Sequence, residues 1–273
     1  MIKKKIDGIP MWLDLKDHGI SKRLLLTNGQ REPGYQWILK KEASGVAYDV
    51  GANIGWYTIL LAERCDKVYA WEPDPRSYKL LEKNIKLNNL TNVEVSQNAI
   101  VENNRVVNML LDKRPNLSRM MPLDMPPKGR GVFVHGTIID GLDESPDFIK
   151  MDIEGGEVAA FKGAWNTLMN AESLKLLVEV HPDKYSKEND FAPLLKECLN
   201  NGYYFKYVVN AKGKMGEFTS RGYKPVKTFK HYKYRSVFDG TQIPWEQIIK
   251  WSTEMPDDGK KVIRSFLLVK DSS

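Results

Sequence analysis

The stretch that decides the fold is VAYDVGANIG, at residues 46–55. Its first half is typical of an apolar strand, and Gly51 and Gly55 predict a tight turn that opens a helix. A second strand follows and ends in Glu72, 21 residues after Gly51. Glycines let the backbone approach a ligand closely, and a carboxylate at the tip of the next strand can accept hydrogen bonds from both ribose hydroxyls. The pattern therefore predicts a site for a nucleoside cofactor.

Two residues separate this turn from the usual dinucleotide fingerprint. Asn53 stands where G-x-G-x-x-G has its second glycine, and Asp49 ends the first strand, where it would repel a pyrophosphate. An acid at Asp49 can instead accept hydrogen bonds from the cationic amino group of an amino-acid moiety. The turn therefore favours S-adenosylmethionine over NAD, and methyl transfer over hydride transfer.

Composition narrows the class of protein. A chain of 273 residues can bury a substantial core, and we expect one domain with additions. Cys65 and Cys198 have no C-x-x-C or zinc spacing, so a disulfide framework and a structural metal are not indicated. No apolar run has the length of a membrane span or the form of a signal peptide, and we expect a soluble, cytoplasmic protein. A net charge of +6 favours an anionic partner without establishing nucleic-acid binding.

Strand-like and helix-like segments alternate from residue 46 to about residue 181, which predicts a parallel sheet covered by helices on both faces. The expected strands are residues 46–51, 67–72, 93–100, 148–153, 174–181, 203–209 and 263–269. The expected helices are residues 35–41, 56–64, 75–88, 157–168 and 191–199. Residues 114–131, with four prolines and two glycines, predict an irregular loop over the carboxyl edge of the sheet. Residues 1–44 are expected to form an N-terminal cap near the cofactor, followed by the main domain at 45–273.

A basic segment interrupts the second half of this domain. Residues 206–235 hold nine Lys or Arg and a single acid, Glu217, with six aromatic residues interspersed. Such a mixture can bind nucleic acid or a phosphorylated sugar. The alternative is an antiparallel extension with a solvated basic face. We expect a basic, aromatic insertion at about residues 210–262.

The cofactor-binding residues are expected around the two strand tips. Asp49 would orient the amino group, Glu72 would hold ribose, and polar groups at the end of the third strand would meet adenine. The alternative is an ordinary strand-to-helix turn that uses glycine for its conformation alone. The full set comprises Asp49, Gly51, Ala52, Asn53, Gly55, Tyr57, Thr58, Glu72, Pro73, Asn98 and Ala99.

A second dense motif is DFIKMDIEGGE, at residues 147–157. A strand delivers Asp152 to the same edge of the sheet, and Glu154 and Glu157 follow at the start of a helix. Carboxylates gathered in one place repel each other, so we expect them to be hydrogen-bonded, bound to a cation or shifted in pKa. The alternative is that Glu154 and Glu157 only favour the positive end of the helix.

The next strand ends in LVEVHP, which places Glu179 and His181 beside this acidic motif. A hydroxyl is a poor nucleophile until its proton is removed, and His181, Asp152 and Glu154 are the expected catalytic residues, with His181 a candidate general base. A divalent cation such as magnesium or manganese, held by Asp152, Glu179 and His181, is the second route. Base catalysis is the preferred hypothesis.

The two motifs together resemble the FkbM family of S-adenosylmethionine-dependent methyltransferases. The resemblance runs from about residue 31 to residue 182. It is carried by residues 49–55 with Tyr57-Thr58, Glu72-Pro73, Asn84, Asn88, 147–157, Gly163-Ala164 and 177–181. It implies the class I methyltransferase fold, a Rossmann-like, doubly wound, seven-stranded and mostly parallel sheet with a reversed final hairpin. It also implies, most often, O-methylation of a hydroxyl on a sugar or natural product.

Three functions stay open from the sequence. The preferred one is methylation of a hydroxyl on a sugar or glycan, a glycolipid or a small metabolite. The second is 2'-O-methylation of RNA ribose, for which the basic segment would hold the strand. The third is a binding module that keeps the fold without catalysis, and the joint presence of Asp49, Glu72, Asp152 and His181 argues against it.

Overall fold

The computed structural model describes residues 1–115, 118–121, 131–229 and 235–272. The strands of the main sheet are β3 (Val46–Val50), β4 (Lys67–Trp71), β5 (Val93–Ser96), β10 (Phe148–Met151), β11 (Leu174–Glu179), β12 (Tyr204–Asn210), β13 (Pro225–Lys227), β14 (Val237–Asp239) and β15 (Ile263–Lys270). The α-helices are α1 (Ile20–Thr27), α2 (Pro33–Glu42), α3 (Trp56–Ala62), α4 (Pro75–Leu87), α5 (Glu157–Lys162), α6 (Trp165–Asn170), α7 (Ala192–Asn200), α8 (Met215–Thr219) and α9 (Trp245–Thr253).

The main sheet is mixed, in the order β13-β14-β12-β15-β11-β10-β3-β4-β5. The five strands β5, β4, β3, β10 and β11 are parallel, whereas β15 is antiparallel to both of its neighbours, β11 and β12. The antiparallel pair of β12 and β15 is the reversed final hairpin that the resemblance implies. Within the described residues the sheet has nine strands, so the expected count of seven is wrong. The short strands β14 and β13 extend the edge beyond β12.

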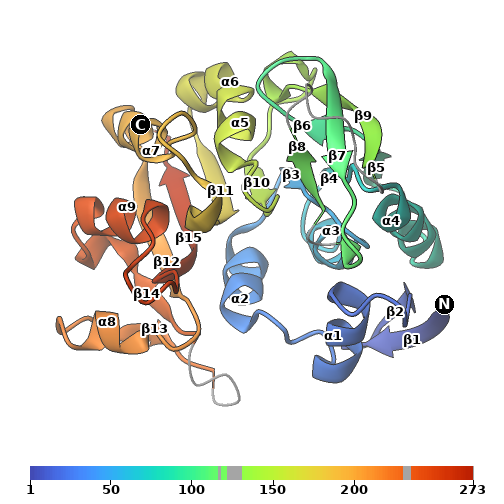
Figure 1. Ribbon diagram of the computed structural model, residues 1–273, viewed down its shortest axis with the longest axis horizontal. Coiled ribbons are helices and arrows are strands. Elements are labelled where there is room, and N and C mark those ends of the chain that lie inside the picture. Colours follow the sequence, from blue (N-terminus) through green and yellow to red (C-terminus); the bar gives the residue numbers. More distant parts are fainter. Residues whose placement is uncertain (116–117, 122–130, 230–234, 273) are drawn as a thin grey trace.

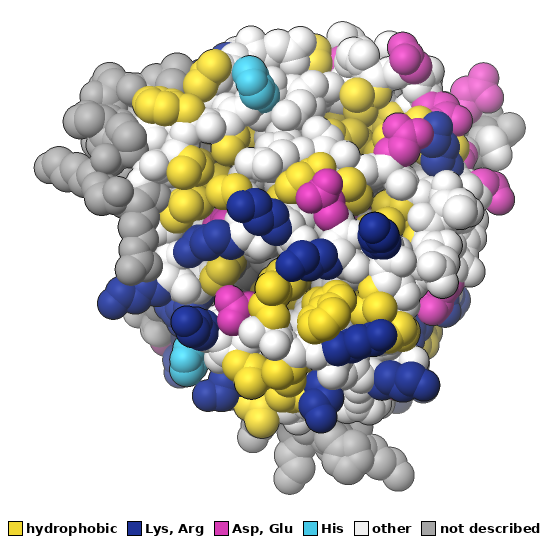
Figure 2. All heavy atoms as spheres, turned by 90° about the vertical axis from the view of Figure 1, so that its right-hand side faces the viewer, with side chains coloured by type: hydrophobic (Ala, Val, Ile, Leu, Met, Phe, Trp, Pro, Cys, Tyr) yellow, Lys and Arg dark blue, Asp and Glu magenta, His cyan; other side chains and the backbone are white. Residues whose placement is uncertain are grey.

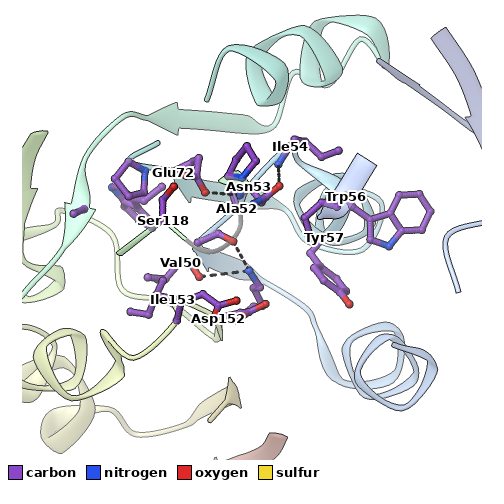
Figure 3. A pocket seen from close by; sticks show the side chains of 18 of the residues that line it. Val50, Ala52, Asn53, Ile54, Trp56, Tyr57, Glu72, Ser118, Asp152 and Ile153 are labelled. Carbon is purple, nitrogen blue, oxygen red and sulfur yellow. Dashed lines mark hydrogen bonds between the residues drawn. The ribbon is translucent and has the colours of Figure 1, made fainter. Parts of the chain in front are cut away.

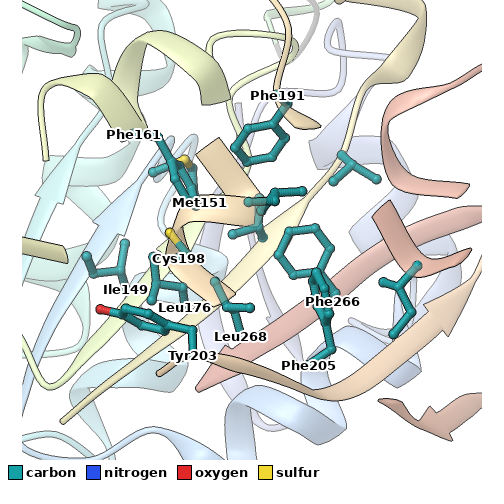
Figure 4. Packing of buried hydrophobic residues seen from close by; sticks show 14 of the residues in the cluster. Ile149, Met151, Phe161, Leu176, Phe191, Cys198, Tyr203, Phe205, Phe266 and Leu268 are labelled. Carbon is teal, nitrogen blue, oxygen red and sulfur yellow. The ribbon is translucent and has the colours of Figure 1, made fainter. Parts of the chain in front are cut away.

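Helices cover both faces of this sheet (Figure 1). On one face Ile149 and Met151 of β10 pack with the buried sides of α5, α6, α7 and α9 (Figure 4). On the other face Phe148 packs with α1 to α4. Because successive side chains of a strand point to opposite faces, one short buried strand supplies both cores. The arrangement is the doubly wound α/β architecture expected from the alternating pattern.

Helix α4 shows how local sequence sets the elements beside the site. Asp74 accepts a hydrogen bond from the backbone N–H of Arg76 at 2.9 Å and caps the helix, and Pro75 occupies its first turn. Leu81 and Ile85 recur at helical spacing and are buried. The helix therefore begins immediately after the tip of β4.

A second, four-stranded sheet is formed by the part of the chain between β5 and β10. Its order is β6 (Ala99–Ile100), β9 (Gly131–Thr137), β7 (Val106–Leu110) and β8 (Arg119–Met121). The predicted strand at 93–100 is therefore split, because its last two residues pair with β9. The predicted loop at 114–131 is wrong where β8 forms. Its residues 116–117 and 122–130 lie outside the described part of the chain.

The predicted helix at 157–168 is also divided, into α5 and α6. A Cβ atom at Gly163 would lie 1.9 Å from the carbonyl oxygen of Val101, so the chain passes against β6 at this point. Asp140 then accepts hydrogen bonds from the backbone N–H groups of Asn166 and Thr167 and caps α6. A long-range cap of this kind has no local sequence signal.

The first 44 residues form a hairpin, β1 (Ile2–Ile6) and β2 (Ile9–Leu13), followed by α1 and α2. β1 and α4 lie on the side of the molecule shown in Figure 2, where basic side chains are interspersed with hydrophobic ones. The lysines of these two elements are exposed: Lys3, Lys4 and Lys5 of β1, and Lys79, Lys83 and Lys86 of α4. No helix in the described ranges has the length and hydropathy needed to cross a membrane.

Candidate active site

A pocket opens at the carboxyl ends of β3, β4 and β10 (Figure 3). After β3 the chain continues to β4 and β5 on one side, and β10 later returns to the other side of β3. Such a reversal of strand order leaves a crevice, and doubly wound folds bind their ligands there. Val50, Glu72 and Asp152 bring the three strand tips into its lining, and Ile20 of α1 closes it from the N-terminal segment.

The glycine turn after β3 forms one wall of the pocket. The backbone N–H groups of Gly51 and Ala52 donate to the carbonyl oxygen of Trp71, at 3.0 and 2.9 Å. Gly51 has φ +83°, and a Cβ atom there would lie 2.1 Å from the carbonyl oxygen of Asp152. Only glycine therefore allows the turn to pass this close to the tip of β10.

Glu72 faces the pocket from the tip of β4 and already holds the turn. Its carboxylate accepts hydrogen bonds from the backbone N–H of Asn53 at 2.7 Å and that of Asp74 at 2.8 Å. Burial raises the pKa of Glu72 to about 7, despite these two hydrogen bonds. Figure 3 shows Glu72 and Asn53 on one side of the pocket and Asp152 with Ile153 on the other. Glu72 therefore lines the pocket at the tip of β4, and its role as a ribose ligand stays a prediction.

Asp49 does not line the pocket. It is fully buried, accepts a hydrogen bond from Thr58 Oγ1 at 2.6 Å, and lies 2.9 Å from Lys150 Nζ. Lys150 Nζ also donates to the carbonyl oxygen of Gly51 at 2.7 Å. Burial alone would lower the pKa of Lys150, but the charges of Asp49 and Asp152 raise it. Asp49 is thus placed to act on the turn through Lys150, which the sequence analysis did not single out.

A second buried ion network lies beside the pocket and was also missed. Glu32 accepts a hydrogen bond from Tyr57 at 2.6 Å and forms ion pairs with Arg31 and Arg264. Burial alone would raise the pKa of Glu32, but the two guanidinium groups hold it well below its usual range. Arg264 continues to Glu179, 2.9 Å away. Residues from both ends of the chain therefore neutralise each other next to the strand tips.

His181 lies at the centre of the acidic cluster. Its Nδ1 is 2.8 Å from Oε1 of Glu157, a fully buried carboxylate that fixes the orientation of the ring. Its Nε2 then faces three further carboxylates, at 3.6 Å from Glu154 and Glu179 and 3.9 Å from Asp152. The sequence predicted that these side chains meet, and the structure brings them together.

The pKa values divide the roles within this cluster. Burial alone would lower the pKa of His181, but the hydrogen bond and charge of Glu157 raise it to about 9. Burial and the charge of Glu179 raise the pKa of Asp152 to about 6, and burial and the charge of Asp152 raise that of Glu154 to about 7. A protonated imidazole cannot accept a proton at neutral pH, so these pKa values argue against His181 as a general base and leave Asp152 and Glu154 as the candidates.

The candidate cation ligands differ from those expected. Asp152, Glu154 and His181 offer one ligand atom each, all within 4.8 Å of one another. Glu179 was expected in this set, but its carboxylate is paired with Arg264 at 2.9 Å and with Lys261 at 3.5 Å. Glu154 stands in its place, and its backbone adopts φ +51°, a conformation that is uncommon outside glycine.

Of the predicted cofactor residues, eight line the pocket: Gly51, Ala52, Asn53, Tyr57, Glu72, Pro73, Asn98 and Ala99. Asp49, Thr58 and Gly55 do not. Gly55 instead begins α3 with φ +90°. Lys150 carries a sequence signal in retrospect, since a lysine inside the buried strand FIKM requires a charged partner. Arg31 and Glu32 carry no such signal.

The strand order and the crevice at its reversal define an α/β protein of the class I methyltransferase type. The methyltransferase FkbM domain matches residues 49–205, which is more than half of the chain. The chain belongs to the FkbM family of S-adenosylmethionine-dependent methyltransferases, as the resemblance in its sequence predicts.

Individual relatives match shorter stretches. The tRNA (guanine(37)-N(1))-methyltransferase Trm5b of Pyrococcus abyssi is 44% identical over 88 residues, which are 32% of this chain and 24% of that protein. An uncharacterized protein of Methanocaldococcus jannaschii is 32% identical over 73 residues, which are 26% of this chain and 28% of that protein. The matches thus span about a quarter of the length of these curated relatives.

Among solved structures, a methyltransferase FkbM from Methylobacillus flagellatus is similar with a TM-score of 0.46 and 18% identity, over 79% of this chain and 52% of that chain. The Trm5b structure from Pyrococcus abyssi has a TM-score of 0.42 and 18% identity, over 87% of this chain and 54% of that chain. Neither similarity says what this chain methylates.

Proposed function

We propose that this protein transfers the methyl group of S-adenosylmethionine to a hydroxyl of a sugar or glycan, a glycolipid or a small metabolite. The observation that carries the proposal is the position of Asp152 and Glu154. Both carboxylates line the pocket, and the pKa of each is raised towards neutrality, to about 6 and about 7. A carboxylate of this kind can accept a hydroxyl proton at neutral pH.

The pocket fits the methyl donor by the chemistry of its lining. Glu72 offers carboxylate oxygens to the ribose hydroxyls, and the glycine turn brings its backbone close to the ligand. Trp71 and Ile100 offer apolar contact to the adenine ring. When bound, S-adenosylmethionine supplies a sulfonium methyl group that a nucleophile can attack. Residues 1–44 would act as a cap on this site, since α1 contributes Ile20 to the lining.

The chain's own residues would do three things in the reaction. Glu72 and the turn hold the donor, and Lys150 keeps the turn in place through the carbonyl of Gly51. Asp152 or Glu154 removes the acceptor proton as its oxygen attacks. Exact positioning of donor and acceptor supplies much of the rate acceleration, because the translational and rotational entropy is then lost on binding and not in the chemical step.

Metal assistance is the competing mechanism. A magnesium or manganese ion on Asp152, Glu154 and His181 would lower the pKa of the acceptor hydroxyl. Glu157 would then orient His181 as a ligand, in the way that second carboxylates orient metal-bound histidines. Loss of activity with a chelator and recovery with magnesium would overturn the base mechanism.

RNA is the second candidate acceptor. The observations that favour it are the match to Trm5b and the basic face shown in Figure 2. The cytoplasmic location expected from the sequence suits either acceptor and stays a prediction.

A radiolabelled methyl-transfer screen over glycan, small-molecule and RNA acceptors tests the proposal. Calorimetry with S-adenosylmethionine should first show binding to the wild type. Glu154→Gln and Asp152→Asn should then reduce transfer at least tenfold, since general bases contribute factors of roughly 10² to 10⁴. Glu246→Gln, an exposed acid on α9, is the matched control and should leave transfer unchanged. Donor binding without transfer to any hydroxyl acceptor would contradict the proposal.

A further inference from the structure

Five cations of the basic segment at 206–235 fall into two groups, those with a carboxylate partner and those that line a pocket. Three of its cations have structural partners: Lys206 pairs with Glu42 at 2.9 Å, Lys214 with Asp258 at 2.8 Å, and Arg221 with Glu217 at 3.2 Å. The first pair joins β12 to α2, whereas the other two lie within the extension itself. These three pairs do not use Lys212 or Arg235.

Lys212 and Arg235 line a second pocket, which we name the cationic pocket. Its charged residues are Lys212, Arg235, Lys260, Lys261, Arg264 and a single acid, Asp183. The Asp183 carboxylate lies 2.7 Å from the ammonium group of Lys184, a residue outside the lining. Five cations therefore gather around one concave site, and Asp183 neutralises little of their charge because it pairs with Lys184.

Three of these cations have no carboxylate partner in the part of the chain that the structure describes. Among the described residues, no carboxylate lies at ion-pairing distance from the side chains of Lys212, Lys260 or Arg235, whereas Lys261 and Arg264 both reach Glu179. Burial and then the charge of Arg264 lower the pKa of Arg235, as expected where a partly buried guanidinium group lies near a second one. Such a site gains free energy when an anion enters.

The cationic pocket adjoins the candidate active site. Arg264 touches Glu179 at 2.9 Å, and Glu179 lies 3.6 Å from Nε2 of His181. Arg235 donates a hydrogen bond to the carbonyl oxygen of Arg31 at 2.7 Å, and Arg31 lines the pocket of the candidate active site. Two chains of contacts therefore link the cationic pocket to the candidate active site, one through Arg264 and one through Arg235.

We propose that the cationic pocket binds a phosphate group of the acceptor and thereby presents its hydroxyl to Asp152 and Glu154. The proposal rests on the proposed function, which it deepens by naming the substrate class as a small phosphorylated acceptor. Guanidinium groups bind phosphate with two parallel hydrogen bonds, and Arg235 lines the pocket with a guanidinium group that pairs with no carboxylate of the described residues. Cations gathered around one pocket suit one phosphate, whereas a nucleic-acid strand needs cations along a track.

Calorimetry with inorganic phosphate and, separately, with S-adenosylmethionine tests the inference. Arg235→Gln should weaken phosphate binding about tenfold or more, since a hydrogen bond to a charged group contributes on the order of 1.5–3 kcal/mol. The double variant Lys212→Gln/Lys260→Gln changes only exposed side chains and should weaken phosphate binding comparably without endangering the fold. Lys227→Gln, an exposed lysine of β13 outside the pocket, is the matched control and should bind phosphate as the wild type does.

The outcomes separate this inference from the proposed function. Donor binding that is intact in every protein, with phosphate affinity lost only in the pocket variants, supports the inference. Equal phosphate affinity in all proteins overturns it and leaves the methyltransferase proposal standing, whereas absence of donor binding in the wild type contradicts the proposed function itself. A single-stranded RNA probe that binds with a steep salt dependence, and is weakened as much by Lys227→Gln as by Arg235→Gln, overturns the small acceptor in favour of RNA.

Discussion

Replacing Lys150 by methionine removes the cation that neutralises Asp49 in the core beneath the glycine turn. The side chains are 1% and 0% exposed, and the ammonium nitrogen lies 2.9 Å from the carboxylate. Methionine keeps most of the apolar volume, so the loss is mainly electrostatic. Removing one partner of a buried ion pair costs about 3–5 kcal/mol, because the other charge stays buried without compensation. We expect the free energy of unfolding of Lys150→Met to fall by that amount.

Urea unfolding followed by circular dichroism measures this loss. The matched control is Lys175→Met on the neighbouring strand, because Lys175 is 31% exposed and its partner Glu42 keeps a second cation, Lys206. We expect the control to lose about 1 kcal/mol or less. Asp49→Asn added to Lys150→Met removes the stranded charge and should recover part of the loss. Equal losses for the two lysine variants, or a double variant no more stable than Lys150→Met, would refute the reasoning.

Three further predictions concern the site. Gly51→Ala should abolish donor binding in calorimetry and destabilise the protein more than Gly213→Ala. At Gly213 φ is +80° but no atom lies within 4 Å of an added Cβ, so backbone strain alone should cost about 1–2 kcal/mol. Equal losses of stability in the two variants would argue against the close approach at Gly51. Because burial raises the pKa of Glu72 from 4.5 to about 7, the folded protein holds a proton that the unfolded chain releases, and the free energy of unfolding falls as pH rises through this window. Urea titrations of Glu72→Gln should show a smaller fall, and an identical slope would contradict this. Glu157→Gln should lower the pKa of His181 from about 9, as measured by NMR titration of the imidazole; an unchanged pKa would exclude Glu157 as its cause.

The sequence predicted the parallel core well because that core follows local rules. A buried parallel strand is a short apolar run, and glycine or acid at its end indicates where it stops. The second sheet and the strands β13 and β14 escaped because they are short and gain stability only from partners distant in the chain. β14, for example, has three residues and pairs with β12, which ends 27 residues earlier.

The site was predictable to the extent that strand tips decide it. Glu72, Asp152 and His181 meet because the carboxyl ends of parallel strands share one edge. Asp49 was expected at the pocket, but Val50, the last residue of β3, lines it instead. Because alternate side chains of a strand face opposite sides, Asp49 points away from the side that Val50 faces. The pairing of Glu32 with Arg264 joins residues 232 positions apart, and no local pattern announces it.

The network around Glu32 has a consequence for the smallest fragment that can work. Glu32 precedes, and Arg264 follows, the residues 49–205 that define the family. A fragment cut to that span would keep every carboxylate at the strand tips but lose Arg264 and Lys261, the cations that hold Glu179 ionised. Residues on both sides of the family domain are thus electrostatic partners of the carboxylates at the candidate active site. An expression fragment that is meant to bind the donor should extend at least from Arg31 to Lys270, the last residue of β15.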